Sequence, residues 1–260
     1  MSMLQFDDDA ARHIRRVYST PDVVQQRAEV IALLAAQPGE RVLDVGSGPG
    51  FLVASLADAV GPGGAVRGLD QSAPMNAAAR DLIKERPWAG IDDGDALTLP
   101  YPDAAFDAVV STQVYEYVAD IPRAFTELRR VLRTGGRAVV LDTDWDSVVW
   151  HVADRERHRQ VMAAWEEHLA HAHLPAALPG AFRRAGFRVT GRHLIPLFNP
   201  TYEQNTFSAL TMETIARFVV GRQGLTQAVV EAWMTDLRER GADDSYLFSI
   251  NRYCFVAVAE

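Results

Sequence analysis

Hydrophobic residues recur in two alternating periods over positions 22–142 of the chain. From position 22 to 36 the apolar side chains stand at helical spacing, and Pro38 and Gly39 end that helix. Short β-branched stretches then predict strands, with helical patterns between most of them. The predicted strands are 41–45, 65–69, 88–92, 106–111 and 137–142, and the predicted helices are 51–60, 73–85 and 120–134. This alternation predicts a parallel sheet covered by helices on both faces and joined by right-handed crossovers.

The pattern changes after position 142. Helices are predicted at 154–172 and 181–185, and strands at 187–197 and 246–259. The long interval 198–245 needs structure of its own, and helical patterns occur there at 211–220 and 226–240. A further helix is predicted at 6–18. We therefore divide the chain into an N-terminal lid helix (1–21), a core (22–145, 178–197 and 246–260) and a cap of helical insertions (146–177 and 198–245).

The charge balance and the cysteine count narrow the possible functions. With a formal net charge of -8, the chain lacks the basic character that phosphate backbones attract, so no nucleic-acid substrate is expected. Cys254 is the only cysteine, so no disulfide can form within the chain, which suits a reducing cytoplasm. The first residues are too acidic for a signal peptide, and the apolar runs are too short for a membrane span. We therefore expect a cytoplasmic protein.

A glycine-rich loop follows the first predicted strand. Gly46, Gly48 and Gly50 alternate in DVGSGPG, so the backbone can pass close to a ligand, and the next helix offers unpaired N–H groups. In an open α/β sheet, ligands bind at such loops, beyond the carboxyl ends of the strands. The dinucleotide fingerprint would need a third glycine at Phe51. Asp70, which ends the second strand, can accept hydrogen bonds from both hydroxyls of a ribose.

Four segments carry a resemblance to a known family. DVGSGPG, GLDQSAPM, DDGDALTLPYPDAAFDAVVS and ELRRVLRTGGRAVV closely resemble the class I S-adenosylmethionine-dependent methyltransferases, in the ubiquinone/menaquinone-methyltransferase-like branch. The resemblance covers about residues 22–145. It implies an α/β, Rossmann-like doubly wound fold with a seven-stranded, mostly parallel sheet, an antiparallel last strand and helical cap insertions. It also implies S-adenosyl-L-methionine as the cofactor, S-adenosyl-L-homocysteine as the product and a small-molecule methyl acceptor.

Carried over position by position, the resemblance assigns the methionine and ribose parts of the cofactor site. Asp44 and the glycine loop with Ser47 would hold the methionine portion, with Asp44 directed at its amino group. Asp70 would bind the ribose. Ser111 and Gln113, just past the fourth strand, would face the methionine end and the transferred methyl group.

The resemblance also assigns the adenine end. Gln71 and Met75 would flank the adenine ring. Asp95 matches the acid that accepts a hydrogen bond from the adenine amine, and Ala96 is its backbone partner. Read from the residues alone, Met75 could equally be core filling, and Asp95 could simply cap a turn.

The remaining candidates lie outside these four segments. The N-terminal helix would close over the cofactor, as such helices do in this family, with Tyr18 and Arg27 near the cofactor carboxylate. Tyr115, the first tyrosine of STQVYEYV, and Trp145 are candidates for an acceptor pocket that takes an aromatic, apolar or amine molecule. His151 is the candidate general base, with a surface or packing histidine as the alternative.

Two groups of potential metal ligands do not meet the requirements of a site. Asp142, Asp144 and Asp146 alternate, but the glycine and glutamate of a calcium loop are missing after them. The histidines within 168–173 do not share one helical face. We therefore expect no metal.

Several functions remain open at this point. The long cap insertions favour a small-molecule enzyme of specialised metabolism, and quinone C-methylation is an alternative. A non-catalytic S-adenosylmethionine-binding regulator would keep the same cofactor residues, whereas a nicotinamide dehydrogenase would bind NAD tightly. The sequence leaves open whether oxygen, nitrogen or carbon is methylated, and whether the protein is a monomer or a homodimer.

Overall fold

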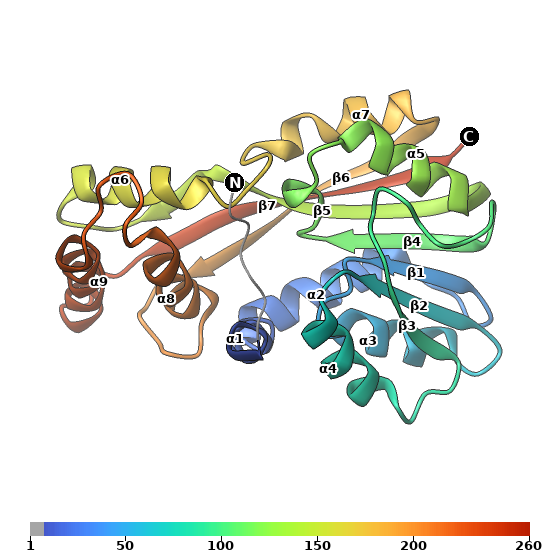
Figure 1. Cartoon of the computed structure of the whole chain (residues 1–260), viewed down its shortest axis with the longest axis horizontal. Coiled ribbons are helices and arrows are strands. Elements are labelled where there is room, and N and C mark those ends of the chain that lie inside the picture. Colours follow the sequence, from blue (N-terminus) through green and yellow to red (C-terminus); the bar gives the residue numbers. More distant parts are fainter. Residues whose placement is uncertain (1–7) are drawn as a thin grey trace.

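One sheet of seven strands organises the computed structural model, which describes residues 8–260 (Figure 1). The strand order is β3-β2-β1-β4-β5-β7-β6. Strands β1 to β5 are parallel, and β7 lies antiparallel between β5 and β6. The strands are β1 (Arg41–Val45), β2 (Ala65–Asp70), β3 (Ala89–Asp93), β4 (Phe106–Thr112), β5 (Leu132–Trp150), β6 (Phe187–Asn199) and β7 (Phe248–Ala259). The predicted mostly parallel, doubly wound sheet with an antiparallel last strand is confirmed.

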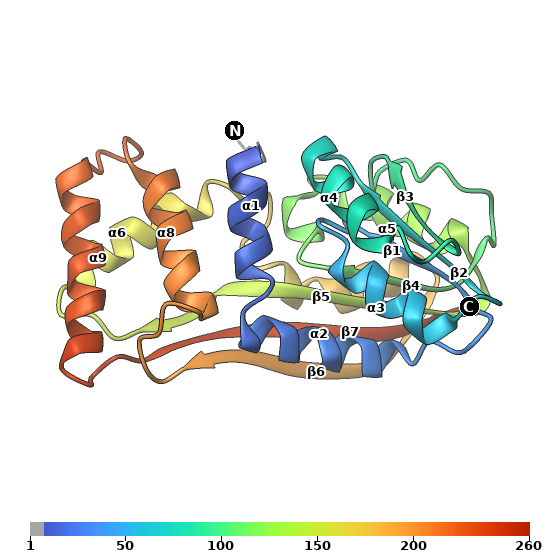
Figure 2. The ribbon, with the colours of Figure 1, turned by 90° about the horizontal axis from the view of Figure 1, so that it is seen from below.

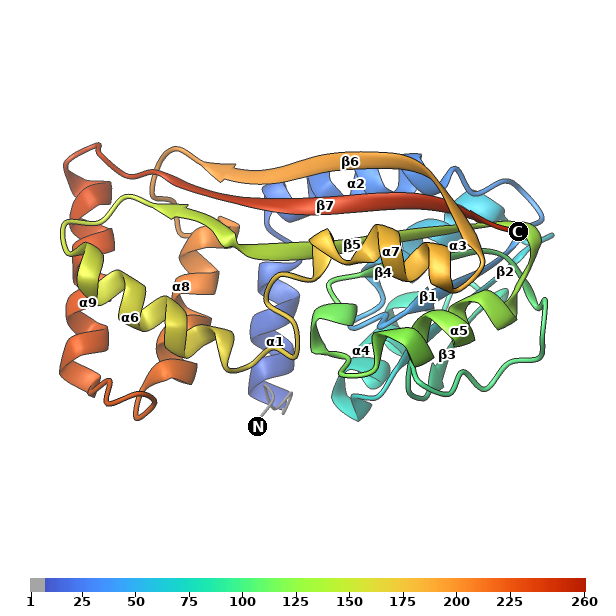
Figure 3. The ribbon, with the colours of Figure 1, turned by 90° about the horizontal axis from the view of Figure 1, so that it is seen from above.

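Helices cover both faces of this sheet. Apolar residues of α2, α3 and α4 pack on one face, and those of α5 and α7 pack on the other. Figures 2 and 3 show these two faces in turn. The helices are α1 (Asp8–Val17), α2 (Pro21–Leu34), α3 (Phe51–Val60), α4 (Ala73–Ile83), α5 (Ile121–Val131), α6 (Arg155–Glu166), α7 (Leu178–Arg184), α8 (Phe207–Val219) and α9 (Gln227–Ala242). Two short 3-10 turns, η1 (Tyr115–Tyr117) and η2 (Leu174–Ala176), complete the elements.

Local signals fix several helix ends. The Asp120 carboxylate accepts a hydrogen bond from the Arg123 amide at 3.0 Å and so caps α5, with a proline in its first turn. α5 ends at Val131 rather than near Gly135 because Leu132 already pairs with Phe106 of β4. Strand pairing therefore overrides the helical pattern in this last turn.

The fifth strand is much longer than the predicted 137–142. β5 has 19 residues, and its pairing with β7 continues as far as Trp150 and Phe248. Asp142 and Asp144 of the alternating acidic motif lie within this ladder, where they pair with Tyr253 and Asn251, and a register shift follows Asp144. The predicted boundary between core and cap at position 145 therefore falls inside a strand, and the division into core and cap stays a prediction.

The predicted cap has a hydrophobic core of its own. Four tryptophans are buried there with residues from α6, α8 and α9, and Trp233 is completely buried. The predicted helix 154–172 ends at Glu166, after which the chain turns so that the Ala170 and His171 amides reach the Glu116 carbonyl. Among residues 8–260, every helix is too short or too polar to cross a membrane.

Candidate functional site

A cavity of about 820 Å³ lies at the carboxyl ends of β1, β2 and β4. The chain reverses its strand order between β1 and β4, which is where a doubly wound sheet leaves a crevice. Helix α1, which contacts α4 on one side and α8 on the other, stands beside this opening (Figure 2). The predicted site residues that line the cavity are Tyr18, Arg27, Asp44, Gly46, Ser47, Gly48, Asp70, Gln71, Met75, Asp95, Ala96 and Gln113.

The glycine loop between β1 and α3 has a shape that other residues do not reproduce. Gly46 has φ +73°, and a Cβ there would lie 2.1 Å from the Val114 side chain. Gly50 has φ +82° and begins α3, where a Cβ would lie 2.7 Å from Cβ of Ala79 on α4. Gly50 therefore shapes the loop by packing against α4 and does not itself line the cavity. Phe51, which replaces the third dinucleotide glycine, does line it.

Asp70 is held firmly at the end of β2. One carboxylate oxygen accepts a hydrogen bond from the Gly48 amide at 2.9 Å, and the other accepts one from the Ser72 amide at 2.8 Å. Burial raises the pKa of Asp70, and these backbone hydrogen bonds oppose the shift. Each carboxylate oxygen has two lone pairs, so both can still accept a bond from a ligand hydroxyl.

Asp44 is almost completely buried at the wall of the same cavity. Its oxygen Oδ1 has no hydrogen-bond partner among the described residues. Burial, and to a smaller extent the negative charge of Asp70, raise the pKa of Asp44 to about 8. The pair therefore suits a ligand that brings positive charge, and the ammonium and sulfonium groups of S-adenosyl-L-methionine fit this requirement.

Met75 and Asp95, the residues predicted for the adenine end, both line the cavity. Met75 lies there on α4, whose N-terminus is capped by the Ser72 hydroxyl. The Asp95 carboxylate accepts a hydrogen bond from the Leu97 amide at 2.8 Å and still lines the cavity. Asp95 therefore caps a turn and also faces the ligand space, so the two interpretations of this residue do not compete.

Tyr18 and Arg27 bring the N-terminal helices to the cavity. The Arg27 guanidinium donates to the Tyr18 carbonyl oxygen at 3.2 Å and lies 5.0 Å from the centroid of the Phe51 ring. Burial lowers the pKa of Arg27. Arg27 is thus a cation held over the glycine loop, where it could meet a ligand carboxylate. The predicted helix began at residue 6, and its first two positions lie outside the described residues.

Several predicted acceptor-side residues lie elsewhere. Tyr115 is packed against Phe125 in the core with its ring centroid 5.1 Å away, because η1 turns it under α5. Trp145 is buried in the cap and donates to the Glu116 carboxylate at 3.3 Å. His151 is exposed beyond the end of β5, where it contacts the Ser245 carbonyl oxygen at 2.6 Å. The structure brings none of these three to the cavity.

Ser111 is also turned away from the ligand space. Its hydroxyl donates to the Val45 carbonyl oxygen at 3.0 Å, between β4 and β1, and its side chain is buried. Gln113, two residues later, lines the cavity with φ +57°. The chain therefore emerges from the sheet between these two predicted contacts.

Sequence reasoning missed a buried polar cluster next to the cavity. Glu116 and Arg252 have fully buried side chains, and Gln26 and Tyr117 line the cavity beside them. An acid between two tyrosines after β4, and an arginine inside the otherwise apolar strand β7, were the available signals. Neither signal predicted that the two residues belong to one cluster, because Glu116 and Arg252 are 136 positions apart in the chain. Only the pairing of β5 with β7 brings Arg252 into this part of the fold.

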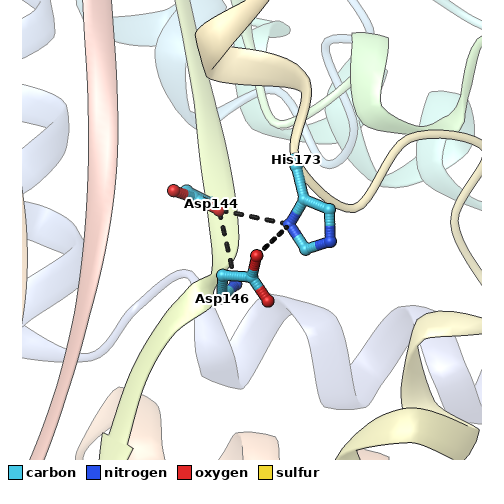
Figure 4. Close-up of side chains that lie close together, drawn as sticks. All are labelled: Asp144, Asp146 and His173. Carbon is cyan, nitrogen blue, oxygen red and sulfur yellow. Dashed lines mark hydrogen bonds and ion pairs between the residues drawn. The ribbon is translucent and has the colours of Figure 1, made fainter.

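The two rejected metal motifs meet at the edge of the cap (Figure 4). His173 Nδ1 lies 3.3 Å from a carboxylate oxygen of Asp144 and 3.3 Å from one of Asp146. The three side chains could in principle hold a cation, since their ligand atoms lie within 4.8 Å of one another. Asp146 and His173 are exposed, and a histidine–aspartate ion pair accounts for the arrangement, so we assign no metal to it.

Comparisons with known proteins show that this chain is similar to methyltransferases. A family model described as a methyltransferase domain matches residues 43–140. The demethylmenaquinone methyltransferase of Symbiobacterium thermophilum is 31% identical over 192 residues, which cover 65% of this chain and 76% of that protein. The 2-phytyl-1,4-naphtoquinone methyltransferase of Synechococcus elongatus is 43% identical over 111 residues, which cover 42% of this chain and 48% of that protein. The chain spans about half the length of several curated relatives that it matches.

A solved structure is similar in fold to almost the whole of this chain. Phosphoethanolamine N-methyltransferase 2 of Haemonchus contortus, in complex with S-adenosyl-L-methionine, has a TM-score of 0.64 and 18% identity. The match covers 98% of this chain and 58% of that one. At this identity the likeness concerns the fold alone.

Proposed function

Because this chain belongs to the class I S-adenosylmethionine-dependent methyltransferases, in the branch that resembles the ubiquinone and menaquinone methyltransferases, we propose that it transfers the methyl group of S-adenosyl-L-methionine to a small-molecule acceptor. The observation that carries the proposal is a pair of acids beside the glycine loop, buried Asp44 and partly buried Asp70, at one wall of a cavity of about 820 Å³. Their spacing along β1 and β2 suits a ligand that has both an ammonium group and a ribose.

The cofactor would lie across the carboxyl ends of the parallel strands. Asp44 would accept from the methionine ammonium, Asp70 from the ribose hydroxyls, and Arg27 would meet the carboxylate. Asp95 would accept from the adenine amine, and Met75 would pack on the ring. These roles follow the family pattern and the positions of the side chains around the cavity.

The chain's own residues would act mainly by positioning. The cofactor supplies a methyl group that is already electrophilic on its sulfonium. Holding a nucleophile in line with that methyl in a dry cavity can contribute up to roughly 7 to 11 kcal/mol. Methyl transfer therefore needs no metal, and a proton acceptor matters only when the nucleophile carries a proton.

The acceptor class has two candidates. A small aromatic or apolar molecule suits the apolar residues that line the cavity, such as Ile14 on α1, Val23 on α2 and Val118 just after η1. A quinone is the second candidate, because demethylmenaquinone methyltransferase is the name of a relative that matches over most of its own length. With a formal net charge of -8, the chain is a poor match for nucleic acid.

The proposal is tested by binding and by turnover. Calorimetry should detect S-adenosyl-L-methionine and S-adenosyl-L-homocysteine binding, and labelled methyl should pass to members of a panel of phenols, amines and naphthoquinols. We expect Asp70→Ala to lose cofactor binding, whereas Asp81→Ala, at an exposed position on α4, should keep it. Binding without turnover on every acceptor class would favour a cofactor-binding regulator, and tight NAD binding instead would favour a dehydrogenase.

A further inference from the structure

A polar layer of buried and partly buried side chains lies beside the cavity, and its two tyrosines pack against the hydrophobic core of the cap. It consists of Gln26, Glu116, Tyr117 and Arg252, together with Tyr18, and we call it the acceptor-side layer. Arg252 donates from Nη1 to the Gln26 side-chain oxygen, and its guanidinium carbon lies 4.6 Å from the centroid of the Phe207 ring. Glu116 and Arg252 both have 0% of their side chains exposed.

This layer contains polar atoms that no group in the described chain satisfies. Glu116 Oε1 and the Nε and Nη2 groups of Arg252 are buried without a hydrogen-bond partner among residues 8–260. Each such atom typically destabilises a fold by about 1 to 3 kcal/mol. Buried polar atoms without a protein partner call for an explanation, such as a catalytic role or an ordered water.

The acceptor-side layer reaches the cavity through three side chains. Tyr18, Gln26 and Tyr117 line the cavity, and both tyrosines interact electrostatically with Glu116 and Arg252. An atom of the Tyr18 ring lies 3.8 Å from where a Cβ on Gly48 would be. The layer therefore adjoins the glycine-loop end of the cavity, where the methionine portion of the cofactor is expected.

We propose that Tyr117 and Glu116 form a proton relay for an acceptor whose nucleophile is a neutral hydroxyl of the phenol or enol class. The inference rests on the proposed methyltransferase function and adds the acceptor chemistry to it. Tyr117 would be the catalytic residue that touches the acceptor hydroxyl, and Glu116 would take up the proton behind it.

The transfer can be written so that atoms and charges balance. The acceptor oxygen attacks the methyl carbon, the carbon–sulfur bond breaks with its electron pair left on sulfur, and an oxygen–carbon bond forms. The acceptor's proton moves to Tyr117 Oη while the Tyr117 proton moves to the Glu116 carboxylate. The positive charge of the sulfonium and the negative charge of the carboxylate disappear together, and S-adenosyl-L-homocysteine leaves.

The charge of Arg252 favours a hydroxyl over an amine. A protonated amine would bring a second positive charge toward a guanidinium that already has two unsatisfied N–H donors. The positive charge of the same guanidinium favours loss of the acceptor's hydroxyl proton, which places negative charge on the oxygen before it attacks. Arg252 acts here through the layer, so it is a positioning residue.

The ionisation of Glu116 is compatible with this role. Burial raises the pKa of Glu116 to about 7, while Arg252, Trp145 and Tyr117 oppose the shift. Burial and the neighbouring Glu116 raise the pKa of Tyr117 well above its ordinary value, so this phenol stays neutral. The other titratable groups that face this cluster are Asp142 on β5, Arg252 on β7 and Tyr18 after α1.

The pH dependence of turnover tests the relay. Since Glu116 must be ionised to accept the proton, we expect kcat/KM of the wild type for a phenol to rise with pH through an apparent pKa above the ordinary range of a glutamate, because burial raises the pKa of Glu116 and of its neighbour Asp142. Glu116→Gln should bind S-adenosyl-L-methionine normally, lose about 100-fold in kcat/KM and lose this rise. Tyr117→Phe should have the same effect. Glu231→Gln and Tyr253→Phe are the matched controls and should keep the wild-type profile.

An acceptor that is already ionised distinguishes the loss of proton transfer from a structural defect caused by the substitution. A nitro-substituted phenol that is already ionised at the assay pH needs no proton acceptor, so Glu116→Gln should lose little activity on it. Equal losses on ionised and neutral phenols, or an unchanged pH rise in Glu116→Gln, would overturn the relay. If Glu116→Gln does not fold, Tyr117→Phe decides by the same two comparisons. A wild type that methylates only amines also overturns the inference, whereas a wild type without any turnover contradicts the proposed function itself.

Discussion

Asp44 is a carboxylic acid that folding removes from water without giving one of its oxygens a partner. The sequence assigned it to the cofactor only through the family pattern. The structure adds the physical reason, because the pKa of Asp44 rises to about 8 through burial and the nearby Asp70. An aspartate in this state is mostly protonated at pH 7 and binds a cation only after it loses that proton.

Cofactor binding should therefore release a proton. An ammonium group beside Asp44 favours the carboxylate and lowers its pKa, so we expect S-adenosyl-L-methionine to displace close to one proton at pH 7. Affinity should rise with pH between 6 and 7.5, because the free protein increasingly has Asp44 already ionised. Calorimetry in buffers of different ionisation enthalpy measures the proton count.

The matched variant for this prediction is Asp44→Asn. It should bind the cofactor more weakly, release almost no proton and show a flatter pH dependence. If the wild type releases no proton at pH 7, Asp44 does not meet the ammonium group.

The sequence-based prediction chose Tyr115 for the acceptor pocket, but Tyr117 is the tyrosine that lines the cavity. Both tyrosines follow the end of β4 within five positions, and the sequence favoured the first one for the acceptor pocket. The 3-10 turn η1 directs Tyr115 into the core beneath α5 and leaves Tyr117 at the cavity. A single turn of backbone decides this choice, and its orientation depends on contacts with Phe125 that lie outside the motif.

Among the elements, the loop that joins β1 to α3 is the one that the sequence described best. Its glycines predicted a close backbone approach, and the structure shows that Gly46 approaches Val114 of the neighbouring strand connection. The three glycines have different roles in this loop. Gly46 and Gly48 leave space for a ligand, and Gly50 allows α3 to pack against α4.

Gly46→Ala should show the cost of filling this space. The left-handed conformation at φ +73° costs an alanine about 1 to 2 kcal/mol, and its Cβ would lie 2.1 Å from the Val114 side chain. Overpacking of this kind adds about 1 to 3 kcal/mol. We expect urea denaturation to show a lower free energy of unfolding by roughly 2 to 5 kcal/mol, with weaker cofactor binding.

Gly61→Ala is the matched control at the other end of α3. Gly61 has φ +65° and ψ -177°, a combination largely restricted to glycine, but nothing lies within 4 Å of the Cβ position, so only the conformational cost of about 1 to 3 kcal/mol applies. Equal losses in the two variants would show that Val114 does not restrict the loop.

The three strands β5, β6 and β7 dominate the whole molecule. They continue from the core sheet into the region that α6, α8 and α9 cover, as Figure 3 shows. β7 pairs with β5 from Val258 to Phe248 and with β6 along its whole length. Core and cap therefore share one hydrogen-bonded sheet and are not joined by a flexible linker.

We expect the whole chain to unfold as one cooperative unit. Differential scanning calorimetry should show a single transition, because separating the cap would break strands β5 and β7 in the middle. S-adenosyl-L-methionine at 100 times its Kd stabilises the folded state by about 2.7 kcal/mol, which should raise Tm by roughly 5 to 10 °C. Two transitions of which only one responds to the cofactor would show that the cap folds independently.

Local patterns in the sequence predicted the alternating strands and helices and the class of sheet, because periodicity and turn residues act within a few positions of where they stand. The cofactor half of the site was predicted through the family resemblance, and the roles of its residues stay a prediction. The fifth strand was predicted too short, because only pairing with β7 extends it beyond position 142.

Only the tertiary structure shows the polar layer beside the cavity, where we propose that the acceptor binds. Glu116, Arg252 and Gln26 meet from three distant parts of the chain, and their burial follows from the packing of α2, η1 and β7 around one cavity. The predicted acceptor residues His151 and Trp145 do not line the cavity. The long strand β5 places Trp145 in the hydrophobic core of the cap and leaves His151 exposed beyond the end of the strand. Which polar side chain faces a cavity depends on long-range strand pairing, and no local pattern encodes it.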